Sequence, residues 1–308
     1  MSEFVCRCRM AEMTTRRRML KAGVAGLLAV GSRSARADVD NKASTYADHA
    51  TGIRILPGAW RPHYYWEHIA WVSPSWPSQD YIWLDFPEAI FTEQGLLYLS
   101  HVNPQVQPVV YPNPPAVRWE SVPNGIAFER MLPNRVSFGG KITRAADSVD
   151  LTLFIRNGGV LPLTRIRLQT CYFLRAIKEF AAFTADNKYV HVPERGWMPY
   201  DETRKLESSR GKYRLGWRGG PAIADRPMMA TVSSQAERLV ACTWQADTHS
   251  LVHNPGHPCM HADPKLGDVS PGESKTIHGK LMFFEGSLDA FSAAIREGRY
   301  DFSAELRG

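Results

Sequence analysis

The chain has 308 residues, of which 44% are hydrophobic and 22% are charged, and its formal net charge is +6. The positive surplus lies in the first 37 residues, which hold eight of the 37 Lys and Arg residues and two of the 31 Asp and Glu residues. The remainder has 29 of each and no net charge, which argues against a nucleic-acid-binding role because phosphate recognition needs a positive surplus.

Residues 1–37 have the features of an export signal. Arg16 and Arg17 form a twin-arginine pattern, an apolar run covers residues 22–30, and Ala35 and Ala37 stand at a cleavage position. The run is too short to span a bilayer. We therefore expect a periplasmic or secreted protein exported by the twin-arginine route, with no membrane span after signal removal. Residues 38–50 are expected to form a flexible leader, followed by a single β-sandwich domain over 51–308.

The first part of that domain, residues 51–115, is rich in aromatic side chains and holds five of the nine tryptophans. Aromatic faces stack on sugar rings, while neighbouring polar groups bind hydroxyls. This pattern predicts a substrate-binding set consisting of Trp60, Arg61, His63, Trp66, His68, Trp71, Trp83 and Asp85. The alternative is that the aromatic side chains cover the core.

Two candidate acid–base residues belong to the same part of the chain. Glu67 stands among the aromatic residues, and His101 closes an expected strand over residues 95–101. Strand ends often present functional groups. The alternative for His101 is an ordinary turn or core histidine.

From residue 124 onward, apolar and polar residues alternate with the period of two that is typical of strands. The clearest runs cover residues 136–143, 148–156, 163–174, 228–233, 238–244 and 276–284. Only residues 175–184 and 288–298 resemble helices. The pattern predicts an all-β fold, a large two-sheet antiparallel sandwich with few short helices.

The expected helix over residues 175–184 would place Arg175, Lys178 and Glu179 on one face. Arg175 and Lys178 are therefore candidates for stabilising negative charge during catalysis. The competing interpretation is a solvated ion-pair face.

A cluster of metal-ligating residue types lies near residue 260. In an extended chain Cys259, His261 and Asp263 point to one face, and His253 and His257 precede them in a loop. A divalent metal ion is therefore a candidate cofactor, with His253, His257, His261 and Asp263 as ligands. His261 is also a candidate acid–base residue. The alternatives are a sugar-binding loop and a hydrogen-bonded loop with Cys259 buried.

Beyond the signal the chain keeps three cysteines, Cys171, Cys242 and Cys259. Because three is odd, at least one thiol stays free of an intramolecular disulfide or binds something.

The run "VDLTLFIRNGGVLPLTRIRLQTCYFL", with "SPGESKTIHGKLMFFEG" near the end, resembles the β-sandwich domains of the galactose-mutarotase-like superfamily. The resemblance covers residues 120–290, and the whole chain resembles a family of exported bacterial proteins. It implies a domain that binds or acts on carbohydrates, as epimerases, polysaccharide lyases and hydrolase accessory domains do. Aldose epimerases of the group carry a histidine where this chain has residues 171–173, Cys-Tyr-Phe.

These observations predict an enzyme that binds a carbohydrate or small-molecule substrate over an aromatic cleft. It would cleave or epimerise that substrate by histidine and carboxylate acid–base chemistry. Two alternatives remain: a metal-dependent enzyme of another class that uses the 253–263 cluster, and a non-catalytic glycan-binding protein.

Overall fold

The computed structural model describes residues 52–61, 63–101, 109–182, 186–206, 210–216, 221–300 and 302. All of them belong to one compact unit, residues 44–308. The predicted export signal and leader, residues 1–50, lie outside the described residues and stay predictions.

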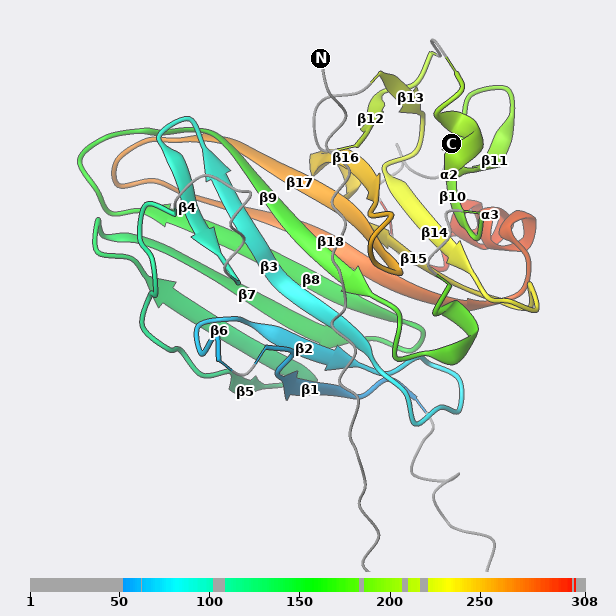
Figure 1. The fold of residues 1–308 in the computed structure, drawn as a ribbon, viewed down its shortest axis with the longest axis horizontal. Coiled ribbons are helices and arrows are strands. Elements are labelled where there is room, and N and C mark those ends of the chain that lie inside the picture. Colours follow the sequence, from blue (N-terminus) through cyan, green and yellow to red (C-terminus); the bar gives the residue numbers. More distant parts are fainter. Residues whose placement is uncertain are drawn as a thin grey trace, which may run out of the picture. The chain divides into compact units, whose positions relative to one another are not determined.

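Two large sheets make up the described part of the chain (Figure 1). Sheet A contains β1 (Ile55–Gly58), β2 (Ile69–Val72), β3 (Ile82–Thr92), β4 (Gly95–Leu99), β9 (Leu163–Phe173), β12 (Tyr213–Leu215), β13 (Ala222–Ala224), β16 (Thr248–His253) and β17 (Cys259–Val269). Its strand order is β1-β2-β3-β9-β17-β16-β12-β13, and β4 pairs with β3. The described pairs are antiparallel apart from β12 with β16, which run parallel.

Sheet B contains β5 (Glu120–Val122), β6 (Gly125–Met131), β7 (Val136–Arg144), β8 (Ser148–Asn157), β10 (Lys188–Val192), β11 (Gly196–Pro199), β14 (Met228–Val232), β15 (Arg238–Thr243) and β18 (Ser274–Glu285). Its order is β11-β10-β14-β15-β18-β8-β7-β6-β5. The prediction of an all-β two-sheet sandwich is confirmed.

The main core lies between the two sheets. It is built from alternate residues of each strand, such as Leu84 of β3, Tyr172 of β9 and Leu153 of β8, all of which are buried. Each fully buried aliphatic or aromatic side chain contributes about 1.5–3 kcal/mol. Because side chains alternate along a strand, the residues between the buried ones on β3, β9 and β17 face away from this core.

A second apolar cluster covers the opposite face of sheet B. Helix α3 (Leu288–Arg296) packs Phe291 and Ile295 against Met228, Leu239 and Met282 of β14, β15 and β18. The expectation of a helix over residues 288–298 therefore corresponds to a real element. The other helices in the described chain are α2 (Tyr200–Thr203) and two 3₁₀ turns, η1 (Lys178–Phe180) and η2 (Gln245–Asp247).

The helix expected over residues 175–184 is wrong, because the described part of that range, 175–182, forms only the 3₁₀ turn η1. The amides of Ile177 and Phe180 bond to carbonyls three residues back, at Leu174 and Ile177. These three buried residues are spaced by three, which matches the three residues per turn of a 3₁₀ helix rather than 3.6.

No helix in the described ranges is long and apolar enough to cross a membrane.

Candidate functional site

The outer face of sheet A, turned away from the core, gathers polar and aromatic side chains over β3, β9 and β17. These three strands lie side by side (Figure 1). Trp83 and Cys259 both pair with Phe173, and Asp85 pairs with Cys171. Because paired residues of antiparallel strands point to the same face, the register alone brings these side chains together.

A β-bulge adds Glu88 to this face. In a regular strand Asp85 and Glu88 would point to opposite faces, because side chains alternate. The register of β3 with β9 shifts between Asp85 and Ala89. Glu88 then accepts a hydrogen bond from Gln169 Nε2 at 2.8 Å, and Gln169 lies two positions before Cys171 on β9.

Asp85, Glu88 and His101 form what we call the acid–base cluster. One donor or acceptor atom of each lies within 4.8 Å of the others. Asp85 is fully buried, whereas Glu88 and His101 are partly exposed and can meet a ligand. Among the described atoms, Asp85 Oδ1 is buried without a hydrogen-bond partner, which is unusual for a native carboxylate.

Arg61 holds the loop that precedes β2 against this cluster. Its Nη2 lies 2.5 Å from Asp85 Oδ2, and its Nε lies 2.9 Å from Glu67 Oε2. Glu67 Oε1 also accepts hydrogen bonds from the backbone amides of Trp60 and Arg61 at 2.8 and 2.6 Å. The Glu67 carboxylate, a predicted acid–base residue, is thus occupied in positioning Arg61.

Ser100 links His101 to Asp85. Its hydroxyl donates to Asp85 Oδ2 at 2.7 Å, and its Oγ lies 3.1 Å from His101 Nδ1. Because the single hydroxyl proton goes to Asp85, Ser100 Oγ accepts from His101, which assigns the proton to Nδ1. His101 Nε2 is therefore the imidazole nitrogen with a free lone pair.

The environment separates the proton affinities of the cluster. Burial raises the pKa of Glu88 to about 8, with His261 opposing the rise and Asp85 adding to it. Burial raises the pKa of Asp85 to about 6, and Arg61 limits that rise. Burial also lowers the pKa of His101 to about 4, helped by Arg61. At neutral pH these directions favour a protonated Glu88 beside a neutral His101.

A second group, which we call the thiol cluster, consists of Cys171, Cys259 and His261. One atom of each lies within 4.8 Å of the others, and all three residues are buried. Cys259 Sγ is 3.4 Å from His261 Nε2. The hydrogen bond with Cys171, together with His261, lowers the pKa of Cys259 well below its usual value despite burial. Burial opposes protonation of His261, but Cys259 and Asp263 raise its pKa well above the usual range.

Aromatic rings border both clusters. Trp60, Trp83, Phe173 and His257 make up this aromatic wall, with the Trp60 and Phe173 ring centroids 4.4 Å apart and those of Trp60 and Trp83 5.8 Å apart. The Arg61 guanidinium lies 4.4 Å from the Trp60 ring centroid. Trp60 and Trp83 keep part of their surface exposed, so the wall can contact a ligand.

Two members of the predicted substrate-binding set belong to the core instead. Trp66 is buried and donates through Nε1 to the carbonyl of Leu99. His68 is buried, and its ring stacks on Phe128 with centroids 3.7 Å apart. Their aromatic rings fill the sandwich, which is the alternative that the composition left open.

The remaining two members of that set lie beside the site. Trp71 pairs with Trp83 across β2 and β3 and is half-buried. His63 is exposed and packs on Tyr64. Among the described residues, neither has a hydrogen bond, ion pair or ring contact with the acid–base cluster.

The predicted metal-ligand set of His253, His257, His261 and Asp263 is not assembled. His253 pairs with Met260, a core residue, and its ring lies near Tyr200, so it points to the face opposite His261. Asp263 does share the outer face with Cys259 and His261, as expected for an extended chain. It lies 3.6 Å from His261 Nδ1 and accepts from the Thr170 amide at 3.2 Å.

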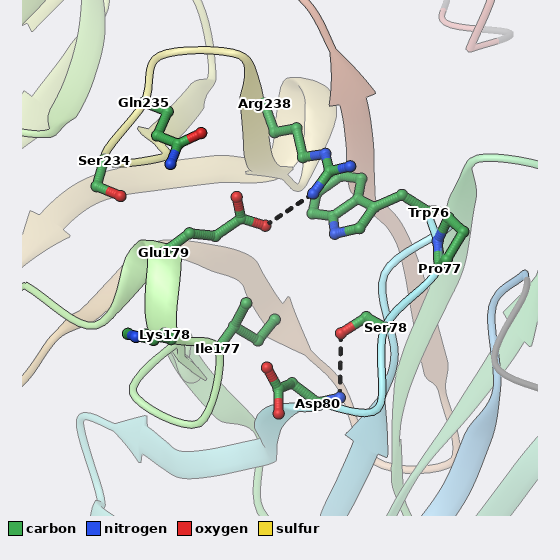
Figure 2. A pocket seen from close by; sticks show the side chains of 10 residues that line it. All are labelled: Trp76, Pro77, Ser78, Asp80, Ile177, Lys178, Glu179, Ser234, Gln235 and Arg238. Atoms are coloured by element: carbon green, nitrogen blue, oxygen red, sulfur yellow. Dashed lines mark hydrogen bonds and ion pairs between the residues drawn. The ribbon is translucent and has the colours of Figure 1, made fainter. Parts of the chain in front are cut away.

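Arg175 and Lys178 do not join either cluster. Both side chains are exposed, and Lys178 lines a separate pocket of about 420 Å³ (Figure 2). There Glu179 pairs with Arg238 at 3.5 Å, and Arg238 lies over the Trp76 ring. None of the ten lining residues belongs to the acid–base or thiol cluster. The ion-pair interpretation of this segment describes Glu179 better than a catalytic one.

The sequence did not predict roles for Glu88 and Ser100, or the placement of Cys171 on this face. Glu88 stands among the polar residues of the aromatic-rich segment, but strict alternation on β3 assigns it to the face opposite Asp85. Ser100 stood directly before a candidate histidine, and the pairing of Cys171 with Asp85 needs the sheet register. Only the proximity of polar residues at neighbouring strand ends could have indicated Ser100.

Comparison with known proteins gives structural likeness only. No family model matches the sequence, and no curated protein matches it. Solved structures that align with the chain include a candidate aldose 1-epimerase from Escherichia coli K12, with 11% identity and a TM-score of 0.41 over 76% of this chain and 100% of the other. A galactose mutarotase-like protein from Lactobacillus casei aligns with 10% identity and a TM-score of 0.40 over 76% and 100%.

A third alignment is to an α-N-acetylgalactosaminidase from Bifidobacterium bifidum, with 12% identity and a TM-score of 0.43 over 76% of this chain and 36% of the other. Two of these structures carry names from the superfamily that the strand pattern resembles. At identities and TM-scores this low, the activities of these proteins cannot be assigned to this chain.

Proposed function

We propose that the protein is a carbohydrate-active enzyme that interconverts ring forms or epimers of a sugar by acid–base catalysis at the acid–base cluster. The observation that supports this most directly is the convergence of Asp85, Glu88 and His101 within 4.8 Å, beside an aromatic wall on one sheet face. The coarser assignment, a carbohydrate-active protein, depends on the wall. The finer one, epimerisation, depends on the geometry of the proton-transferring groups.

The short separation of the cluster argues for proton transfer within one sugar ring. An inverting hydrolase needs its two carboxyl groups about 6.5–9.5 Å apart, so that a water molecule fits on the far side of the sugar. Groups within 4.8 Å suit two oxygens bonded to one carbon, such as the anomeric hydroxyl and the ring oxygen. A retaining hydrolase has its carboxyl groups about 5–5.5 Å apart and uses one of them as a nucleophile. Asp85 is held by Arg61 and Ser100, which disfavours it in that role.

The roles follow from the hydrogen bonds. His101 Nε2 takes the proton of the anomeric hydroxyl while the Glu88 carboxylic acid gives its proton to the ring oxygen, so that the bond between carbon 1 and the ring oxygen breaks. The open-chain aldehyde rotates and closes again with the proton transfers reversed. Ser100 and Asp85 hold the Nδ1–H tautomer of His101 and stabilise its transient positive charge.

The aromatic wall supplies binding. A sugar ring stacked on Trp83 would bury its C–H face and turn its hydroxyls towards Glu88 and His101. Stacking on the wall and hydrogen bonding to Glu88 and His101 would give the partly exposed residues of the site a contact with the sugar.

The first prediction concerns Glu88 and His101. Glu88→Gln and His101→Asn should each slow anomeric interconversion about 10²–10⁴-fold, which is the usual contribution of one acid–base group. Rates are measured by exchange NMR over a panel of neutral hexoses and pentoses, with the uncatalysed rate subtracted. Sugar affinity, followed by tryptophan fluorescence, should change little.

Two exposed residues provide matched controls. Glu93→Gln, in the turn directly after β3, and His278→Asn, on β18, make the same chemical changes away from the site and should keep the wild-type rate. Full activity in Glu88→Gln and His101→Asn would overturn the proposed roles. Sugar binding without turnover by the wild type would identify a non-catalytic glycan-binding protein, and release of cleaved products would identify a hydrolase or lyase.

We also propose, from the sequence alone, that the protein works outside the cytoplasm after twin-arginine export. Replacing both Arg16 and Arg17 by Lys should retain the full-length chain in the cytoplasm, as cell fractionation would measure. Export of the Lys variant at the wild-type level would contradict this route.

A further inference from the structure

The thiol cluster has the composition and the geometry of a metal site. Cys259 and His261 alternate onto the outer face of β17, and Cys171 reaches them from the adjacent strand β9. Their ligand atoms lie within 4.8 Å of one another and are buried. Both strands are interior strands of sheet A, flanked by β3 and β16, so the ligands stand on rigid elements.

The distances are close to those of a filled site. In a tetrahedral zinc site the Zn–S bond is about 2.3 Å and the Zn–N bond about 2.0–2.1 Å, so that a sulfur and a nitrogen ligand lie about 3.6 Å apart. Cys259 Sγ and His261 Nε2 are separated by 3.4 Å. A metal ion would therefore enter with only a small adjustment of these side chains.

The surroundings of His261 resemble those of a metal ligand. Its Nε2 faces Cys259, and its other ring nitrogen, Nδ1, faces Asp263 Oδ1 at 3.6 Å. Asp263 is fixed by the Thr170 amide. A carboxylate on the far nitrogen orients a metal-bound imidazole and makes it a better ligand. A disulfide between Cys171 and Cys259 would need neither the imidazole nor this carboxylate.

We propose that Cys171, Cys259 and His261 bind one zinc ion, with Asp263 as the positioning residue for His261. Two thiolates and one imidazole are the ligand types that zinc prefers, and two thiolates balance its charge. In the described residues the group whose ligand atoms all lie within 4.8 Å of one another holds these three residues, so we assign three protein ligands; His257, which hydrogen-bonds Cys259, lies outside that group. Its fourth position is left to a water molecule.

This ligand set differs from that expected from the sequence, since it takes Cys171 and Cys259 in place of His253 and His257. It also shares no residue with the acid–base cluster. The zinc site and the proposed function can therefore fail separately: Glu88→Gln should lose turnover and keep zinc.

The test is zinc binding by the full chain, purified under reducing conditions and dialysed against a weak chelator. Elemental analysis and native mass spectrometry should find one zinc per chain. Cys171→Ser, Cys259→Ser and His261→Gln should each lose it, whereas Cys242→Ser should keep it. Cys242 is a matched control because it is also a buried free cysteine, on β15 and outside the group.

The absorption spectrum of the cobalt-substituted protein identifies the ligand types. Co²⁺ in the wild type should give thiolate-to-metal charge-transfer and tetrahedral ligand-field bands, and these bands should be absent in Cys259→Ser. Asp263→Asn keeps all three ligands and should weaken zinc affinity about 10–100-fold, which a purely structural role of Asp263 would not do. Circular dichroism checks that each variant is folded.

The proposal is overturned if the folded, reduced wild type takes up no zinc. It is also overturned if the cobalt spectrum lacks thiolate bands, or if Cys171→Ser and Cys259→Ser retain the metal.

Discussion

His68 shows how one buried side chain sets a pH limit for the fold. Its ring stacks on Phe128, with Trp119 edge-on at 5.6 Å between centroids. Burial, together with the nearby Arg130, lowers the pKa of His68 to about 3. The folded state therefore holds this imidazole neutral, while the unfolded chain binds a proton near pH 6.5.

The linkage predicts acid instability. Above pH 6.5 both states are neutral and His68 adds no pH dependence; as the pH falls from 6.5 towards 3 the unfolded state alone gains a proton, so stability is lost. At pH 5 this costs about 2 kcal/mol. His68→Phe should remove that share of the difference in urea unfolding free energy between pH 7.5 and pH 5. The exposed variant His278→Asn is the control, and an unchanged difference in His68→Phe would contradict the argument.

Glu88 marks the limit of prediction from sequence at the residue scale. Trp60, Trp83, Asp85, His101 and His261 were singled out because residue type and neighbours indicated chemistry, and the structure places all five around the site. Glu88 depends on the bulge in β3, which no composition or periodicity announces. The same aromatic signal also selected Trp66 and His68, because the residues suited to stacking on sugars are equally suited to filling a core.

At the scale of elements, β7 depends on a glycine that leaves no room for a side chain. A Cβ on Gly139 would lie 2.4 Å from the Phe128 carbonyl oxygen and 2.5 Å from the Phe154 ring. The first neighbour is backbone of the adjacent strand β6 and cannot swing aside. The close approach of β6 and β7 at this position therefore depends on Gly139.

Gly139→Ala should destabilise the protein by roughly 1–3 kcal/mol, the usual cost of overpacking, despite the entropy that alanine saves. The shift is measured as a lower denaturant midpoint at unchanged slope. Gly256→Ala is the matched control, since its nearest neighbour would be the Asn254 side-chain oxygen at an ordinary 3.4 Å. Equal midpoints for Gly139→Ala and the wild type would show that β6 and β7 can separate without cost.

The elements that the sequence predicted best are those with a long alternating pattern. Strands β8, β9 and β18 have ten to twelve residues and bury alternate residues over much of that length, so their period of two is readable. Short strands such as β5 and β12 have three residues and carry no readable period. Residues 175–184 failed for a related reason, because apolar residues spaced by three are common to an α-helix and a 3₁₀ turn.

At the scale of the whole molecule, the outer faces of the two sheets carry different features. The outer face of sheet A carries the acid–base cluster, the thiol cluster and the aromatic wall, whereas α3 covers β14, β15 and β18 on the outer face of sheet B. The main core separates the two faces. Stability contributed by the α3 cluster should therefore be independent of the site.

Phe291→Ala tests this independence. Phe291 is fully buried between α3 and sheet B, so its truncation should cost about 3–5 kcal/mol and lower the melting temperature by on the order of 10 °C. Well below the new melting temperature, zinc content and sugar affinity should equal those of the wild type. Val160→Ala is the control variant, because Val160 is 90% exposed and its truncation should leave the melting temperature unchanged. If folded Phe291→Ala loses zinc or sugar binding, the sheets are coupled through the core, and the site depends on the packing of the far face.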